Sequence, residues 1–344
     1  MDDFVFSEED YIFNVDWQCQ EKSEFSLKLE NAWILKMKKK CFRYELNITT
    51  SRILEGEHGF FAQLNTDRAF NRRMPEKISS VNQPFSLDGF NFTKANEEEI
   101  MFSFSKCDCL AQNEDKNIFM INVSPHERFH CLLLPSLYKC LPQILNKEAL
   151  NLGISSVLLN GSVEQRAGFN SLCGYASVNH LHLHTYYLNQ PMKLETIVVK
   201  HLIGNCFVLE NYPAKAFVFQ VTTKGELNEI VNDIYLLVNL FIQKNVAHNL
   251  FITRGLGFER SKGSKETSER DCVRIYVWAR TSSFGYKTLD EFNPAICELF
   301  GHLIVKTSKA YEELTETRVA EILYSITHEP YSSVKECVKD LYKR

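Results

Sequence analysis

The sequence has 344 residues, a formal net charge of −4 and a pI of about 6.2. This length suggests two domains or one double-sized unit, and the weakly acidic balance argues against general nucleic-acid binding, which needs a broad basic surface. The chain contains no run of about 18 apolar residues, so we expect no membrane-spanning helix and no membrane partner.

The cysteines and the N-terminus indicate the cellular compartment. The 11 cysteines are an odd number and include no Cys-x-x-Cys pair, which favours reduced thiols over a disulfide framework. The N-terminal segment is acidic, with Asp2, Asp3, Glu8, Glu9 and Asp10, and so differs from a secretory or mitochondrial targeting signal. We therefore expect a cytoplasmic protein.

The first half of the chain predicts an alternation of helices and short strands. Residues 25–41 carry apolar side chains at helical spacing and end in lysines, which predicts an amphipathic helix. A second helix is expected at 142–153, and a connection rich in turns at 160–174. Short apolar runs predict strands at 99–104, 117–123 and 130–135.

The second half repeats this rhythm. A long amphipathic helix is expected at 226–244, a charged loop at 261–271, and a further helix at 294–314 that begins with a proline. Two more helices, 316–327 and 332–342, follow. Apolar runs predict strands at 196–200, 216–221, 249–253 and 273–279. The whole order predicts an α+β fold, with mostly antiparallel sheets and packed helices.

Three histidines stand at alternate positions near the middle of the chain. His180, His182 and His184 are separated by Leu181 and Leu183, so on a β-strand all three imidazoles would share one face. One chemistry that fits is metal binding, since His-x-His pairs on strands bind zinc or iron. Such sites usually recruit a further ligand nearby, and no His-Asp pair follows this segment.

The other chemistry makes the middle imidazole a nucleophile toward phosphorus. A neutral imidazole attacks at neutral pH without prior deprotonation. The flanking imidazoles and the hydroxyl of Ser177 can hold the charge that builds on the phosphoryl oxygens. A group of Arg68, Arg72 and Arg73 would suit a phosphate, although such groups are more often surface charge.

These residues resemble the signature of the histidine-triad (HIT) superfamily. The segment from His180 to Tyr187 is similar to its His-φ-His-φ-His-φ-φ motif, and Ser177 stands where the superfamily often has a phosphate-contacting serine. The stretch 122–125, followed by His130, resembles the ribose-binding strand and turn of the same fold. Further stretches resemble the GDP-hexose phosphorylase branch, which is related to galactose-1-phosphate uridylyltransferase: 63–65, 90–94, 170–171, 248–249 and 301–302.

The resemblance implies a two-step transfer that needs no cofactor and no metal. His182 would attack the α-phosphorus of GDP-glucose or another GDP-hexose, release hexose 1-phosphate and leave a guanylyl-histidine. Inorganic phosphate would then attack this intermediate and release GDP. In the implied roles, His180 orients His182, His184 and Ser177 hold phosphoryl oxygens, Asn122 lies near the ribose with His130 at the adjoining turn, Asn170 and Ser171 lie near the phosphates, and Arg72 or Arg73 binds the incoming phosphate.

Two other functions stay open. The transferase and plant phosphorylase relatives usually carry Gln at the third triad position, whereas His184 is typical of hydrolytic HIT proteins. The alternative enzyme is therefore a HIT-type hydrolase that acts on a nucleoside diphosphate sugar or a nucleoside phosphoramidate. The non-enzyme alternative is a nucleotide-binding regulator that kept the fold. Length favours the phosphorylase, because the HIT hydrolases are much shorter.

The resemblance also predicts how the chain is divided. We expect an N-terminal arm and helix at 1–45, a catalytic HIT-like half at 46–191, and a second HIT-like half with C-terminal helices at 192–344. The second half has no triad of its own. It would be a degenerate copy that supports the nucleotide site or forms a homodimer.

Overall fold

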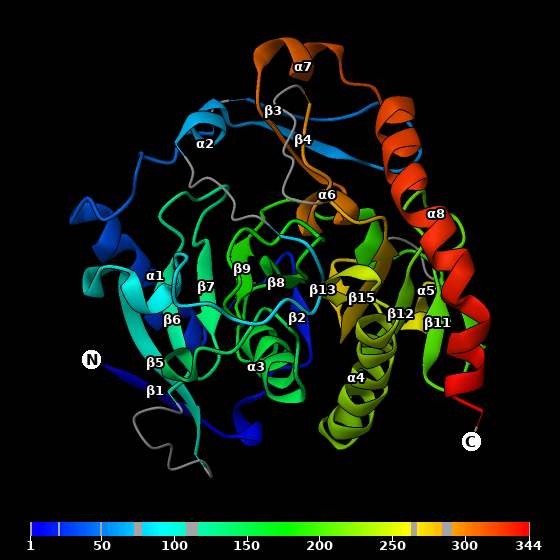
Figure 1. Ribbon diagram of the computed structural model, residues 1–344, viewed down its shortest axis with the longest axis horizontal. Helices are drawn as coiled ribbons and strands as arrows, with labels where there is room; N and C mark the ends of the chain where they lie inside the picture. The colour runs from blue at the N-terminus through cyan, green and yellow to red at the C-terminus, as the bar shows by residue number, and fades with distance from the viewer. Residues whose placement is uncertain are drawn as a thin grey trace.

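An 11-stranded sheet crosses the whole protein (Figure 1). The computed structural model describes residues 2–19, 21–48, 50–71, 78–107, 116–262, 267–283 and 291–343. The strand order is β1-β5-β6-β7-β9-β8-β13-β15-β12-β11-β10, and within it only β1 and β5 pair parallel. The predicted α+β fold with a mostly antiparallel sheet is therefore confirmed.

The first half of the chain supplies one side of this sheet. Its strands are β1 (Asp3–Phe6), β5 (Ile100–Lys106), β6 (Ile118–Ile121), β7 (Cys131–Leu134), β8 (Gln165–Asn170) and β9 (Leu183–Tyr187), and helix α3 (Lys147–Leu158) stands between β7 and β8. Helix α3 starts later than predicted because Asn146 caps it and accepts from Ala149 N. β9 fills the position between β7 and β8.

The second half repeats the strand order of the first. Its strands are β10 (Lys200–Ile203), β11 (Cys206–Val208), β12 (Phe217–Val221), β13 (Ala247–Gly255) and β15 (Cys272–Arg280), and helix α4 (Leu227–Gln243) stands between β12 and β13. In the first half the sheet order is β5-β6-β7-β9-β8, and in the second half it is β10-β11-β12-β15-β13. In both, three strands that follow one another in the chain are neighbours, and the last strand that the half adds to this sheet lies between the third of them and the fourth strand. This repeated order supports the predicted duplication of one fold.

The two halves meet at β8 and β13. These strands pair antiparallel from Asn170 opposite Asn249 to Arg166 opposite Thr253. Helices α3 and α4 lie side by side on one face of the sheet (Figure 1). Their apolar stripes pack on strands of both halves and form one large core. The halves therefore share a sheet and a core, although each keeps its own strand order.

The opposite face carries a small sheet and short helices. β3 (Ser51–Ile53), β4 (Phe61–Leu64) and β16 (His302–Val305) form that sheet, with β4 and β16 parallel. The predicted helix 294–314 is wrong, because α6 (Ile296–Phe300), β16 and α7 (Ser308–Glu313) take its place. Gly301 ends α6 with a φ of +102°, a conformation that glycine favours and that stops a helix.

The last helix is continuous where the sequence predicts two. α8 (Glu316–Leu341) contains Pro330 within its length. A proline has no N–H to offer the carbonyl four residues earlier, here that of Ile326. This carbonyl instead accepts from Thr281 N, just after β15, at 2.8 Å. The replacement bond satisfies the carbonyl that the proline leaves without its helical partner.

The remaining elements include the predicted amphipathic helix near the N-terminus. α1 (Glu24–Lys38) confirms it, and its buried residues include Phe25, Leu29 and Trp33. The short elements are β2 (Val15–Asp16), β14 (Glu269–Arg270), α2 (Thr66–Phe70) and α5 (Phe258–Ser261). β14 pairs with β2 and lies inside the segment predicted as a loop. Among the described residues, no helix has the length and apolar character needed to cross a membrane.

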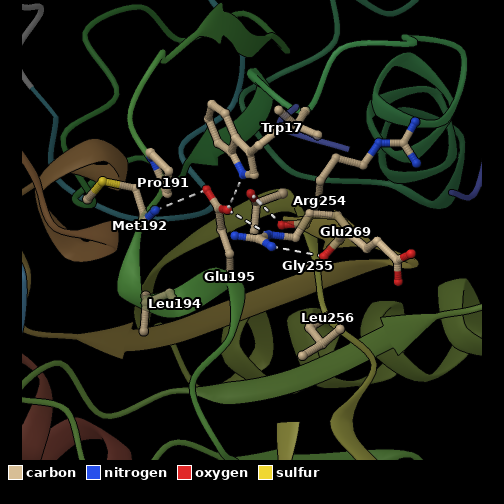
Figure 2. A network of polar contacts seen from close by, with 12 residues as sticks. Trp17, Pro191, Met192, Leu194, Glu195, Arg254, Gly255, Leu256 and Glu269 are labelled. Atoms are coloured by element: carbon tan, nitrogen blue, oxygen red, sulfur yellow. Dashed lines mark hydrogen bonds and ion pairs between the residues drawn. The ribbon is translucent and has the colours of Figure 1, made fainter. Parts of the chain in front are cut away.

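A buried ion-pair network holds the connection between the halves (Figure 2). Oε1 of Glu195 lies 2.5 Å from Arg166 Nη2 and accepts from Met192 N at 3.2 Å. Its Oε2 accepts from Arg270 Nε at 2.9 Å and from Trp17 Nε1 at 3.3 Å. All three charged side chains are buried, so each compensates the lost hydration of the others. The network joins the N-terminal arm, β8 and β14 to this connection.

Candidate active site

One cavity is lined by residues from both halves of the chain and by Arg43 of the N-terminal segment. It adjoins β6, β8 and β9 on one side and α6 and β16 on the other. Its polar and charged lining residues are Arg43, Asn65, Arg68, Glu99, Asn122, Ser124, His126, Asn170, Tyr175, Ser177, His182, His184, Asn293, Cys297, Glu298 and Lys306. A ligand in this cavity would therefore contact both halves.

The triad segment does not form a single strand. β9 begins at Leu183, so among the three histidines only His184 lies in it. Gln143 holds the irregular backbone before the strand. Its Oε1 accepts from His182 N at 2.8 Å, and its Nε2 donates to His182 O at 3.1 Å and to Asn170 O at 2.9 Å. The prediction that all three imidazoles share one strand face is wrong for this reason.

His182 turns a ring nitrogen without a proton toward the cavity. Its Nδ1 donates to the backbone oxygen of His180 at 2.7 Å, because a carbonyl oxygen can only accept. Nε2 of the neutral ring then carries a lone pair, and in the described part of the chain no group bonds it. Burial lowers the pKa of His182 to about 4, so the ring is neutral at pH 7. This state is that of a nucleophile.

His180 faces away from the cavity. Its Nε2 donates to Leu137 O and its Nδ1 accepts from Phe92 N, both at 3.1 Å. Burial lowers its pKa to about 4. Both ring nitrogens are used, so the three triad histidines do not converge on one metal ion. His180 contacts the nucleophile through its backbone oxygen and not through its imidazole.

A relay of hydrogen bonds sets the tautomer of His184. The backbone N–H of His126 donates to His130 Nδ1 at 3.2 Å, so neutral His130 carries its proton on Nε2. That nitrogen lies 3.1 Å from both Nδ1 of His184 and Nδ2 of Asn122. Of these two neighbours, only the imidazole nitrogen can accept its proton. His184 is left with a proton on Nε2 and lines the same cavity as His182, whose ring centre is 5.1 Å away. The pair thus combines a lone pair with an N–H donor.

The other predicted residues lie on the cavity or behind it. Asn122 and Ser177 line it, and Oδ1 of Asn122 accepts from Ser124 N at 3.0 Å. Ser171 lies behind the lining. Its Oγ accepts from His248 N at 2.9 Å, which fixes the loop after β8 to β13.

Asn170 joins the two halves at the cavity wall. Its Oδ1 accepts from Asn249 Nδ2 at 2.6 Å and from Ile296 N at 3.2 Å. Because the amide oxygen is used twice, the amide nitrogen is the group that can face a ligand oxygen. Asn170 therefore has the chemistry expected of a phosphate contact.

Among the described residues, the cations of the cavity include two that the sequence does not indicate. Arg72 and Arg73 lie outside the described residues. Arg43, Arg68 and Lys306 line the cavity. Arg68 belongs to the arginine group seen in the sequence, but Arg43 and Lys306 carry no local motif that could have found them. Only the long-range packing of the arm and of β16 brings them to the site.

A carboxyl group lies among these cations. Glu298 is buried and accepts from Ala295 N at 3.0 Å. Burial raises its pKa to about 7, although Arg68 and Lys306 act in the opposite direction. Nζ of Lys306 donates to Asn293 Oδ1 at 2.9 Å. The second half thus supplies the cavity with a polar wall that can bind a phosphate or a sugar hydroxyl.

Another part of the lining is apolar. Phe92, Met120, Leu132 and Val178 belong to one small core, with Phe90 packed against it, and all five side chains reach the cavity. An apolar surface beside polar groups is typical of a site for a small ligand. The cavity suits a ligand that has a flat apolar part and an anionic part.

Comparisons with known proteins agree with this geometry. The family model "GDPGP1-like, N-terminal domain" matches residues 24–186, and "GDPGP1-like, C-terminal domain" matches 189–344. A Danio rerio protein named GDP-D-glucose phosphorylase 1 is 40% identical, covering 97% of this chain and 96% of its own. The Homo sapiens protein of that name is 37% identical, covering 93% and 86%. An Arabidopsis thaliana protein named GDP-L-galactose phosphorylase 1 is 28% identical, covering 88% and 70%.

A solved structure shares the fold. Yeast Ap4A phosphorylase in complex with AMP superposes with a TM-score of 0.59 over 90% of this chain and 97% of its own. Its sequence is 13% identical, so the likeness concerns the fold alone. It supports the predicted α+β fold with mostly antiparallel sheets and packed helices.

Proposed function

The chain belongs to the GDPGP1-like family, and from this we propose that it is a nucleotidyltransferase that cleaves GDP-D-glucose with inorganic phosphate. The products are GDP and glucose 1-phosphate. Relatives named for this activity match nearly the whole chain, at up to 40% identity. The finer proposal concerns the route: a covalent guanylyl group is carried on His182.

The orientation of His182 is the observation that carries this route. Its Nδ1–H is held by a backbone oxygen at 2.7 Å, so Nε2 can attack phosphorus without losing a proton first. The positive charge that the ring gains on attack is stabilised by the same bond. An imidazole held in the opposite tautomer could not react in this way.

The first step breaks the bond between the α-phosphorus and the bridging oxygen. Nε2 of His182 forms a bond to the α-phosphorus, and hexose 1-phosphate leaves with the electron pair of the broken bond. Negative charge builds on the phosphoryl oxygens, where the Nε2–H of His184 and the amide of Asn170 can donate. The leaving phosphate requires cationic partners, for which Arg68 and Lys306 are the candidates.

The second step restores the enzyme. An oxygen of inorganic phosphate attacks the α-phosphorus, the nitrogen–phosphorus bond breaks, and its electron pair returns to His182. GDP then leaves. The roles proposed for Ser177 and Asn122, at the phosphoryl oxygens and the ribose, fit their places on the cavity lining. The same cations can serve the leaving hexose phosphate and the incoming phosphate in turn, since both are phosphate monoanions or dianions.

In this proposal, each of the three parts 1–45, 46–191 and 192–344 contributes residues to the cavity. The catalytic half provides the nucleophile, the second half provides the polar wall with Lys306, and the N-terminal segment provides Arg43. We therefore interpret the second half as a supporting copy and not as a second catalytic centre. A homodimer is the alternative role, and the mass of the native protein in solution would test it.

Product analysis tests the activity. GDP-glucose should yield glucose 1-phosphate and GDP only when phosphate is present, and the rate should rise with phosphate concentration. Equal turnover without phosphate, with GMP in place of GDP, would instead identify a hydrolase. The third triad residue, His184, makes this comparison necessary, since the hydrolytic HIT proteins also carry histidine there.

The compartment is a separate proposal. Cysteines of the described residues carry free thiols, several of them buried. This supports a reducing environment, and we propose the cytoplasm. Imaging of the tagged full chain in cells would test it.

A further inference from the structure

Three metal-binding side chains meet beside the cavity and outside the triad. His126 comes from the loop between β6 and β7, Cys297 from α6 and His302 from the start of β16. One ligand atom of each lies within 4.8 Å of the others, and the residues are 4%, 5% and 0% exposed. The cluster bridges the two halves of the chain.

The spacing of the nitrogen and the sulfur suits a tetrahedral ion. Nε2 of His126 lies 3.5 Å from Sγ of Cys297. With zinc bonds of about 2.0–2.1 Å to nitrogen and about 2.3 Å to sulfur, a tetrahedral angle separates two such ligands by about 3.5 Å. A hydrogen bond between a thiol and an imidazole gives a similar distance between sulfur and nitrogen. A second observation is therefore needed to indicate a metal ion.

His302 supplies that observation. Its Nε2 donates to Gln63 Oε1, because Gln63 uses its own nitrogen to donate to Glu127 Oε2 at 2.7 Å. Nδ1 of His302 is therefore an acceptor. The group that faces it is the hydroxyl of Tyr186 at 3.5 Å, which is too far for a good hydrogen bond. A fully buried lone pair without a close donor is costly, and a cation would satisfy it.

The surroundings of His302 also match those of a metal ligand. Histidines that bind metals usually donate their second N–H to an oxygen that is itself hydrogen-bonded to the protein. Here that oxygen belongs to Gln63, which is held in turn by Glu127. These bonds fix the ring and leave Nδ1 as the nitrogen that can bind an ion.

Binding changes the protonation of one ligand only. Metal ions bind neutral imidazoles, and the hydrogen bond from Nε2 of His302 to Gln63 leaves Nδ1 of the neutral ring without a proton. Cys297 binds as a thiolate. On binding, the S–H bond breaks, the sulfur–metal bond forms and the proton passes to solvent.

We propose that His126 Nε2, Cys297 Sγ and His302 Nδ1 bind one zinc ion. Two imidazoles and one thiolate form a ligand set that zinc prefers. Since His126 and Cys297 line the cavity, the fourth position of the ion opens toward it and takes a water molecule. This site does not depend on the proposed reaction, and no step of that reaction passes through it.

The ion would have a structural role. It cross-links the β6–β7 loop to α6 and β16, across the wall of the cavity. The backbone N–H of His126 donates to His130, whose Nε2 meets His184. Fixing His126 therefore also fixes the relay that sets the tautomer of His184. In this role the zinc ligands are positioning residues.

Metal analysis of the full chain tests the proposal. Wild-type protein that is stripped with a chelator, desalted and loaded with Zn²⁺ should hold one zinc ion per chain after a second desalting. Loading with Co²⁺ should give the thiolate-to-cobalt absorption band and the visible bands of a tetrahedral ion. Failure to retain zinc, or a cobalt protein without the thiolate band, would overturn the site whether or not any variant folds.

Variants locate the ion. Cys297→Ser should lose the thiolate band and the bound zinc, whereas Cys206→Ser, which changes another buried cysteine on β11, should keep both. Gln63→Leu should weaken zinc affinity by about 10–100-fold, because it removes the oxygen that orients His302. An unchanged band in Cys297→Ser would place the ion elsewhere and refute the assignment.

Discussion

Strands β9 and β15 occupy the same place in the two halves, but they present different chemistry on one face of the sheet. β9 lies between β7 and β8, as β15 lies between β12 and β13. Tyr186 of β9 and Tyr276 of β15 belong to one core, so His184 and Arg274, two residues before them, point to the same side. His184 reaches a cavity, whereas Arg274 is fully buried.

The difference lies in how the polar groups are paired. Arg274 donates to the backbone oxygens of Leu256 and Ile197, at 2.8 and 2.7 Å, and nearby Glu195 is enclosed by two arginines. His182, just before β9, keeps Nε2 for the cavity. Buried polar groups that are paired with protein stabilise a fold, and one that is left for a ligand can react.

Removing the nucleophile, His182, should have the largest effect on turnover. His182→Ala should lower the turnover of GDP-glucose by at least about 10⁴-fold, because the covalent route is lost. The variant should stay folded, because the ring lines the cavity and its one hydrogen bond among the described residues is to a backbone oxygen. His201→Ala, at an exposed histidine of β10, is the control and should keep full activity. A loss below tenfold in His182→Ala would mean that another group attacks phosphorus.

The buried network of Glu195, Arg166 and Arg270 should show the opposite result, a loss of stability without a loss of turnover. Glu195→Gln keeps the shape but leaves Arg166 and Arg270 buried without a counter-charge, which should lower the free energy of unfolding by about 3–5 kcal/mol. Urea denaturation measures this loss. The turnover of the folded fraction should stay close to that of the wild type. A large loss of turnover at unchanged stability would show that the network serves the reaction.

The third triad position sharpens the comparison. His184→Ala removes an N–H donor and should lower turnover by about 10²–10³-fold. His184→Gln keeps a donor of similar reach and should remain within about tenfold of the wild type. The ratio of turnover with and without phosphate should be measured in both variants. If Gln behaves like Ala, donation by His184 is not its role.

The free energy of unfolding should depend on pH through His248, a buried histidine of the second half. Burial lowers the pKa of His248, on β13, from 6.5 to about 4. Between these values the unfolded chain binds the proton more readily than the folded one, so stability is full above pH 6.5 and falls as the pH decreases toward 4. The slope from this group approaches about 1.4 kcal/mol per pH unit.

The variant His248→Gln isolates this contribution. Its free energy of unfolding, measured by urea denaturation at several pH values, should depend less steeply on pH than that of the wild type. The comparison uses the slope, since the substitution itself costs stability at every pH. Equal slopes in both proteins would contradict the assignment of a lowered pKa to His248.

Local patterns in the sequence predicted part of this molecule. The amphipathic helices α1 and α4 were found because their apolar residues recur at helical spacing. β8 was missed because its sequence, Gln165–Asn170, shows no apolar alternation. It is buried on both sides, and at Gly168 a Cβ atom would lie 3.0 Å from the Leu250 carbonyl oxygen. The close approach of β13 and of the Ile296 side chain explains that glycine, and no local signal in the sequence indicates it.

The candidate site also combines residues that local patterns in the sequence predicted and residues that only the fold brings together. His182 and His184 were found from their spacing, and Ser177 and Asn122 from a resemblance. Lys306 and the cluster of His126 with Cys297 were not found, because residues far apart in the chain make them. The error at residues 294–314 has the same origin, since parallel pairing with β4 and the left-handed Gly301 override an apolar spacing that fits a helix.

The proposed reaction requires that His182 carries the guanylyl group between the two steps. Incubation of the protein with GDP-glucose in the absence of phosphate, followed by alkaline quenching and peptide mass spectrometry, tests it most directly. We expect one GMP group on the peptide that contains His182, stable in base, lost in acid and discharged as GDP when phosphate is added. An active enzyme that never shows this adduct, or shows it on another residue, would exclude His182 as the carrier.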